Sequence, residues 1–256
     1  MNESVRDYKE KPLTNREFKA LPARQKLDYL WKYKRIHVIM YAVELVLIVT
    51  ALLFLYSGNK NRLTGIVLNA SNSAPTEIFE KLNADFQEAA RKYSKKTKVE
   101  VVGGFKYYLD DDSKVENNYG IIRLLVENMN KGNLDFLTGD QETVVILAYS
   151  GFFQDLSTIL SKEQVEQYKP YFRYIDQAIV DEIALAAESE TKVDIQLPDC
   201  ENPEEMKKPI PVMIDVSHYE DFGTLYPEAT EPVVFGIFAK SLEIGGLRNI
   251  IDLIFE

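Results

Sequence analysis

The longest unbroken apolar stretch of the chain lies near its N-terminus, at residues 36–57. It contains a single charged residue, Glu44, and its apolar positions cover every face of a helix. Such a helix rises about 33 Å, at about 1.5 Å per residue, which matches a hydrocarbon core of about 30 Å. Because a helix buried in a soluble protein is seldom apolar on all faces for so long, the stretch predicts one transmembrane helix.

Beyond residue 60, short apolar runs alternate with segments whose apolar positions recur at helical spacing. We predict strands at 65–69, 99–102, 134–137, 211–216 and 233–238, with Gly103 and Gly104 ending the second strand. We predict helices at 76–93, through 121–129 up to Gly132, at 141–149, at 161–169 with Ser161 as N-cap, and at 242–255.

Two later stretches carry weaker signals. Residues 175–187 fit either a helix or a strand, and residues 198–208 are typical of a polar loop. Between them Val193, Ile195 and Leu197 alternate with polar residues, which indicates a strand with one wet face. Because strands that alternate with helices are typical of crossover units, the expected fold is α/β, with a mainly parallel sheet and flanking helices, preceded by the transmembrane helix.

Charge divides the chain of 256 residues at the same point. Residues 1–35 carry ten Lys and Arg and five Asp and Glu, a net charge of +5, whereas residues 60–256 carry 20 and 34, a net charge of −14. The positive-inside rule places the N-terminus in the cytoplasm. We therefore expect a basic cytoplasmic segment at 1–35, a single-pass helix at 36–57 in the cell membrane, and an extracellular α/β domain at 58–256.

A cleaved signal peptide is the competing interpretation of the apolar stretch. Signal peptides begin within the first few residues and have apolar regions of about 7–15 residues, whereas this stretch begins after 35 residues. An uncleaved anchor is therefore favoured. Glu44 has two open explanations, since it either pairs with a helix of a membrane protein partner or stays protonated in the lipid.

Composition removes several classes of function. The acidic domain repels phosphate backbones, which argues against nucleic acid as a partner. Cys200 is the only cysteine and is expected in an exposed loop, so no disulfide forms within the chain. With His37 and His218 as the only histidines, we expect no multi-histidine metal site and no cofactor. The acidic run at 110–112 with Glu116 does not match a calcium loop, and a solvated loop is preferred.

No catalytic motif is present. Ser217 and His218 are neighbours in sequence, which does not create a catalytic dyad, and no phosphate-binding or dinucleotide-binding glycine loop occurs. An enzyme is therefore not expected. Ligands of open α/β sheets bind beyond the carboxyl ends of strands. The candidate ligand contacts are Asn69, Ser71, Ser73, Thr138, Asp140 and Asp215, for each of which a helix cap or a loop hydrogen bond is the alternative.

Three segments carry a family resemblance: residues 132–140 (GNLDFLTGD), 151–161 (GFFQDLSTILS) and 209–215 (PIPVMID). The chain resembles extracellular solute-binding proteins of bacterial uptake systems over residues 64–175 and 209–256. It is also similar to uncharacterised Gram-positive membrane proteins with an aromatic- and lysine-rich lead-in to one N-terminal helix. The chain departs from the solute-binding family in having a transmembrane anchor instead of a lipid-attached cysteine, and its outer part is short for two full lobes.

The resemblance implies α/β lobes with a ligand cleft and non-catalytic binding of a small solute. The alternative function is that of an accessory membrane subunit whose outer domain docks a partner protein, with Glu44 as a possible contact in the membrane. A polar-lined cleft favours the first function, and an exposed apolar patch favours the second.

Overall fold

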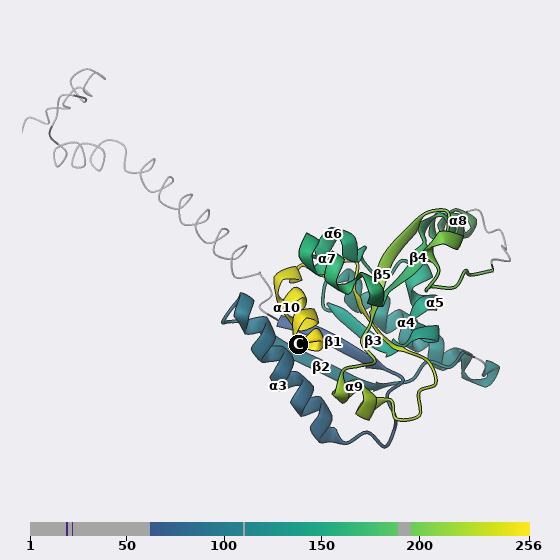
Figure 1. The fold of residues 1–256 in the computed structure, drawn as a ribbon, viewed down its shortest axis with the longest axis horizontal. Coiled ribbons are helices and arrows are strands. Elements are labelled where there is room, and N and C mark those ends of the chain that lie inside the picture. Colours follow the sequence, from purple (N-terminus) through teal and green to yellow (C-terminus); the bar gives the residue numbers. More distant parts are fainter. Residues whose placement is uncertain (1–18, 20–21, 23–61, 110, 189–195) are drawn as a thin grey trace, which may run out of the picture. The chain divides into compact units, whose positions relative to one another are not determined.

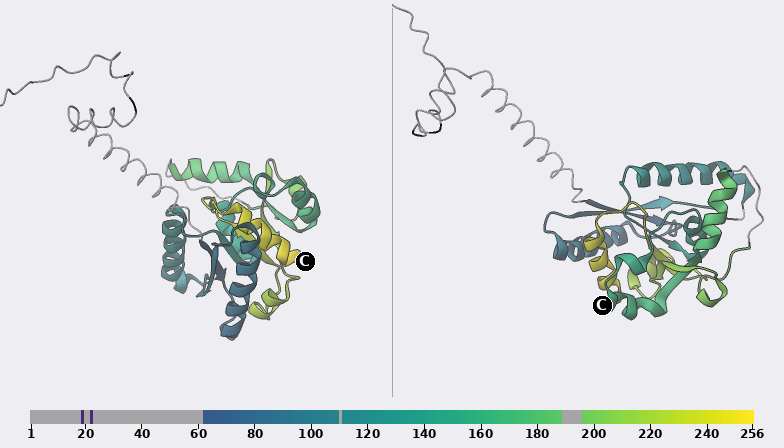
Figure 2. Two further views of the ribbon diagram at one scale, coloured as in Figure 1. Left: turned by 90° about the vertical axis from the view of Figure 1, so that its left-hand side faces the viewer. Right: turned by 90° about the horizontal axis from the view of Figure 1, so that it is seen from above.

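The computed structural model describes residues 19, 22, 62–109, 111–188 and 196–256. The elements from residue 62 onward belong to one compact unit, in which helices cover both faces of a six-stranded sheet (Figure 1; Figure 2). The α/β class with flanking helices is therefore confirmed. The predicted anchor at 36–57, Glu44 and most of the basic segment at 1–35 lie outside the described residues.

The strands are β1 (Arg62–Leu68), β2 (Lys98–Phe105), β3 (Phe136–Asp140), β4 (Phe172–Asp176), β5 (Pro209–Asp215) and β6 (Val233–Ile237). The helices are α3 (Thr76–Tyr93), α4 (Val115–Asn130), α5 (Gln141–Tyr149), α6 (Leu156–Ile159), α7 (Lys162–Tyr168), α8 (Gln177–Glu188), α9 (Glu220–Leu225) and α10 (Ile244–Phe255). Among these described helices, none combines the length and the apolar character that crossing a membrane requires.

The prediction of a mainly parallel sheet is wrong. The strand order is β2-β1-β3-β6-β5-β4, and only the pairings of β1 with β2 and with β3 are parallel. The pairings of β3 with β6, β6 with β5 and β5 with β4 are antiparallel, so the sheet is mixed. Because β4 and β6 run opposite to the others, their first residues lie at the edge where β1, β2, β3 and β5 end. We call this edge the carboxyl edge.

The core has one layer on each face of the sheet. On one face, Phe86 of α3 and Ile251 of α10 pack with Phe136 and Phe235, whose rings stack with centroids 4.9 Å apart. On the other face, Leu125 of α4 and residues of α5 pack on Ile66, Leu68 and Leu137. This burial of apolar surface on both faces is the main stabilising contribution to the domain.

Several predicted elements agree with the structure. The helices at 76–93 and 141–149 have the predicted bounds, and Ser161 caps α7 in a capping box with Gln164. The ambiguous stretch at 175–187 is the end of β4 followed by α8. Leu197 lies in no strand, while Val193 and Ile195 lie outside the described residues.

Strand β2 continues through the glycine pair that was expected to end it. Gly103 gives room to the ring of Phe79, because a Cβ at this position would clash with the ring, and Gly104 adopts a φ of 88°. Side chains of α3 also cover the free edge of β2. The N–H groups of Val99 and Val101 donate to the amide oxygens of Gln87 and Asn83, at 3.0 and 2.7 Å. These bonds block pairing with a further strand.

Cys200 is buried, with 5% of its surface exposed, which corrects the expectation of an exposed residue. Its backbone carbonyl accepts a hydrogen bond from the N–H of Tyr174 in the edge strand β4, at 2.8 Å. Burial raises the pKa of the thiol to about 11, so the thiol is neutral at physiological pH.

Candidate functional site

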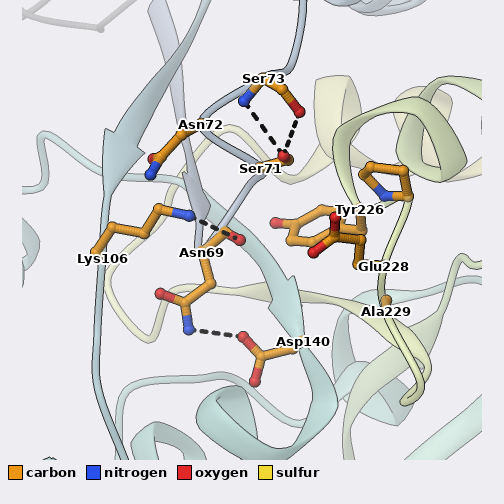
Figure 3. A pocket seen from close by; sticks show the side chains of 10 residues that line it. Asn69, Ser71, Asn72, Ser73, Lys106, Asp140, Tyr226, Glu228 and Ala229 are labelled. Atoms are coloured by element: carbon orange, nitrogen blue, oxygen red, sulfur yellow. Dashed lines mark hydrogen bonds between the residues drawn. The ribbon is translucent and has the colours of Figure 1, made fainter.

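The carboxyl edge has a switch point between β1 and β3. The chain leaves β1 for β2 on one side and then returns to β3 on the other side. At such a point the connections diverge and leave a crevice, which is the usual ligand position in open α/β sheets. A pocket of about 460 Å³ opens here, which we call the switch-point pocket. It is lined by Asn69, Ser71, Asn72, Ser73, Lys106, Asp140, Tyr226, Pro227, Glu228 and Ala229 (Figure 3).

Asn69 joins the elements that surround the pocket. Directly after β1 it adopts a left-handed conformation with a φ of 61°, which asparagine tolerates better than most residues. Its side-chain oxygen accepts from the N–H of Tyr107 at 2.7 Å. Its side-chain nitrogen donates to Asp140 Oδ2 at 2.7 Å and to Thr143 Oγ1 at 3.1 Å. One side chain thus holds together the segments that follow β1, β2 and β3.

Asp140 is the N-cap of α5. Its Oδ1 accepts from the N–H of Thr143 at 2.9 Å, while its Oδ2 accepts from Asn69. The alternative of a helix cap is therefore confirmed for this residue, although its side chain also lines the pocket. Both carboxylate oxygens already accept hydrogen bonds from the protein. Asp140 is therefore less free to accept a hydrogen bond from a ligand than the sequence suggested.

Tyr226 lines the side of the crevice opposite Lys106 (Figure 3). It is 8% exposed, and its hydroxyl donates to the backbone carbonyls of Leu68, at 2.6 Å, and of Thr138, at 3.2 Å. Burial, with a smaller effect from the charge of Asp140, raises the pKa of the hydroxyl well above its usual range. The hydroxyl therefore stays protonated and bridges the diverging ends of β1 and β3.

The loop after β1 supplies small polar groups. The hydroxyls of Ser71 and Ser73 are 2.8 Å apart, and the N–H of Ser73 donates to Ser71 Oγ at 3.2 Å. The N–H of Ser71 donates to the carbonyl of Leu225 at 2.8 Å, which fixes the loop against α9. Hydroxyl groups can both donate and accept, so this wall suits a polar ligand.

Lys106 follows β2 and brings an ammonium group to the pocket. Its Nζ donates to the carbonyl of Ala70 and lies 3.4 Å from the carbonyl of Asn69. No carboxylate of the described residues pairs with it in an ion pair. Within the described residues its direct hydrogen-bond partners are these two backbone carbonyls.

Two of the predicted contacts lie elsewhere. Thr138 is fully buried within β3, and its hydroxyl has no hydrogen-bond partner in the described part of the chain. Asp215 ends β5 at the same edge but pairs with Arg173, with 2.7 Å between Asp215 Oδ2 and Arg173 Nη2. Asp215 Oδ1 accepts from the N–H and the hydroxyl of Ser217. Neither residue lines the switch-point pocket.

The structure brings Asn69, Ser71, Ser73 and Asp140 together and adds residues that the sequence did not single out. These are Asn72, Lys106 and the segment 226–229 between α9 and β6. Contact of any of these side chains with a ligand stays a prediction.

Ser217 and His218 do not form a dyad. Ser217 Oγ donates to Asp215, whereas His218 Nε2 lies 3.1 Å from the carbonyl of Ile254 and the ring packs on Phe255. In the acidic loop, Asp111 caps a short 3₁₀ helix through the N–H of Ser113. Across the described ranges, no group of three His, Cys, Asp or Glu side chains is placed to hold a metal ion.

A comparison of the chain with protein-family models, curated proteins and solved structures finds no match. The similarity to extracellular solute-binding proteins therefore rests on the sequence segments alone.

Proposed function

We propose that the domain binds a small polar solute, without catalysis, in the switch-point pocket. The observation that supports this most is that four side chains chosen from the sequence line one pocket of about 460 Å³ together with Lys106. That volume lies within the range of about 300–1,000 Å³ that is usual for small-molecule sites. Asn69 and Tyr226 hold the pocket walls through the hydrogen bonds described above, so the site is formed before any ligand enters.

The proposal includes a solute-binding-like domain presented outside the cell membrane. The apolar run at 36–57 and the excess of Lys and Arg before it support a single-pass anchor with a cytoplasmic N-terminus. The net charge of −14 from residue 60 onward supports a partner other than nucleic acid.

Replacement of Ser73 by tryptophan tests the proposal. Ser73 is exposed and lines the pocket, so an indole at this position fills the space while leaving the core intact. Thermal unfolding of the full chain is measured against sugars, amino acids, peptides and metal ions. We expect at least one solute to raise the melting temperature, and its affinity, measured by calorimetry, to fall at least tenfold in the Ser73→Trp variant.

The matched control is Ser150→Trp, which changes an exposed serine outside the pocket and should bind as the native chain does. Equal binding by the native chain and the Ser73→Trp variant would exclude the switch-point pocket as the site.

A second candidate function is docking of a membrane protein partner, and an apolar stripe on α4 supports it. Val115, Tyr119, Ile122, Val126 and Met129 follow one stripe of α4 at helical spacing. Val115 is 43% exposed and Tyr119 is 72% exposed, whereas the other three are half-buried and pack partly against the core. A cross-linking amino acid at position 119 in intact cells should give one defined adduct with a membrane protein, and the exposed substitution Val115→Ser should weaken it. If the adduct forms equally with Val115→Ser, the stripe is not a docking surface.

A further inference from the structure

Two charged side chains of the switch-point pocket remain free for a ligand. Among the described residues, Lys106 Nζ donates to the carbonyls of Ala70 and Asn69 alone, so at least one of its protons can reach another acceptor. Glu228 is exposed, lines the pocket, and forms no ion pair within the part of the chain that the structure describes.

The remaining polar groups are engaged with the protein or uncharged. Asp140 accepts from Thr143 and Asn69, and the Tyr226 hydroxyl is bound to two backbone carbonyls. Ser71, Asn72 and Ser73 offer neutral donors and acceptors on the same wall as Lys106. The pocket therefore carries one positive and one negative group for ligand recognition, with neutral groups beside the positive one.

The two charges come from different segments and lie on opposite sides of the pocket. Lys106 follows β2, whereas Glu228 belongs to the connection between α9 and β6, and Figure 3 shows the two side chains across the pocket from one another. A neutral ligand would shield both groups from water without giving either a charged partner, which costs free energy in a partly desolvated site.

We infer that the ligand is a small zwitterion with one carboxylate or similar oxyanion and one primary amine, such as a free amino acid. This inference rests on the proposed function. The anionic group is held by Lys106 with the hydroxyls of Ser71 and Ser73, and the amine is held by Glu228. Charge-assisted hydrogen bonds are stronger and more directional than neutral ones, so both ends of the ligand are selected.

Titration calorimetry of the full chain tests this with three sets of probes. The sets are the common free amino acids, their N-acetyl and carboxamide derivatives, and neutral sugars. Acetylation removes the positive charge of the amine, and amidation removes the carboxylate charge. We expect at least one free amino acid to bind and both of its derivatives to lose tenfold or more in affinity, the loss expected for one charge-assisted hydrogen bond.

Two charge-neutralising variants assign the ends of the ligand. Lys106→Met and Glu228→Gln should each weaken binding of the free amino acid tenfold or more. Lys106→Met should bind the free amino acid and its carboxamide equally. Glu228→Gln should bind the free amino acid and its N-acetyl derivative equally. Lys131→Met and Glu204→Gln remove exposed charges outside the pocket and should change nothing.

The outcomes separate the two proposals. If a neutral sugar binds, Ser73→Trp abolishes its binding, and both charge variants bind it normally, the zwitterion inference is overturned and the proposed function stands. An amino acid that binds as well as its two derivatives also overturns the inference alone. If no probe of the three sets binds the native chain, the zwitterion inference is overturned, and the proposed function is overturned with it when the peptides and metal ions of the thermal screen also fail to bind.

Discussion

Replacement of Arg173 by methionine is expected to lower the free energy of unfolding by about 3–5 kcal/mol, the usual cost of removing one partner from a buried ion pair. The Arg173 side chain is 10% exposed and that of Asp215 is 18% exposed, with 2.7 Å between Nη2 and Oδ2. Glu201 lies 3.2 Å from the same nitrogen, and Nε donates to Gln141 at 2.8 Å. The substitution leaves Asp215 largely buried without its cation. Chemical unfolding of the full chain, followed by circular dichroism, measures the loss.

An exposed arginine provides the control. Arg123 pairs with Glu127 one helical turn away at 2.9 Å, and these side chains are 82% and 50% exposed. Arg123→Met should lower the free energy of unfolding far less than Arg173→Met, because solvent screens such exposed pairs. Arg173→Met combined with Asp215→Asn should regain part of the loss, since the second change removes the unpaired charge. If Arg173→Met and Arg123→Met lower the free energy of unfolding equally, burial does not make the loss of an ion-pair partner more costly in this domain.

The same ion pair explains why Asp215, a predicted ligand contact, does not line the switch-point pocket. Asp215 follows an apolar strand at the carboxyl edge, as a ligand contact would, and its sequence neighbours do not distinguish the two roles. Its partner Arg173 is 42 residues earlier in the chain and lies in the part of β4 that the sequence patterns did not predict, before the ambiguous stretch at 175–187. A pairing between residues so distant in sequence depends on the order of the strands, which local patterns do not encode.

Local signals predicted the helices best. The predicted stripe at Ile78, Leu82, Phe86, Ala89 and Tyr93 places α3 at its observed bounds, although Tyr93 itself is exposed, and Ser161 marks the start of α7. Periodicity and capping are properties of neighbouring residues, so they can be recognised without knowing the fold. Strand direction is not such a property. The residues of β6 are all buried and resemble those of a parallel strand, although β6 is antiparallel to both neighbours.

These errors of fold also account for the missed residues of the pocket. Because β2 was expected to end at Val102 and ends at Phe105, Lys106 was not placed just beyond the end of a strand. The segment 226–229 precedes β6, and only the antiparallel direction of β6 brings its start to the carboxyl edge. In a mainly parallel sheet, that segment would open at the opposite edge. The observed sheet therefore brings both Lys106 and Glu228 to the pocket.

Asp176 should show the second large effect, through three backbone hydrogen bonds. It is 3% exposed at the end of β4. Its Oδ1 accepts from the N–H groups of Ala178 and Lys208, at 3.0 and 2.9 Å, and its Oδ2 accepts from the N–H of Lys207 at 2.8 Å. One carboxylate thus caps the start of α8 and fixes the loop before β5. Asp176→Asn is expected to cost about 3 kcal/mol at pH 7, because the bonds lose their charge and a side-chain NH₂ faces a backbone N–H.

The loss of stability caused by Asp176→Asn should depend on pH. Burial has the largest influence and raises the pKa of Asp176, but the hydrogen bonds from Lys207, Ala178 and Lys208 together outweigh it and hold the pKa below its usual value. The stabilisation is therefore complete above the unfolded pKa of about 3.9 and is lost as the pH falls through the lower folded pKa. The difference in unfolding free energy between the native chain and Asp176→Asn should narrow between pH 5 and pH 2, measured by chemical unfolding across that range. Asp181→Asn is the control, because its side chain is 62% exposed and lies 3.9 Å from Lys208. A difference for Asp176→Asn that stays constant with pH would mean that the charge of Asp176 does not stabilise the fold.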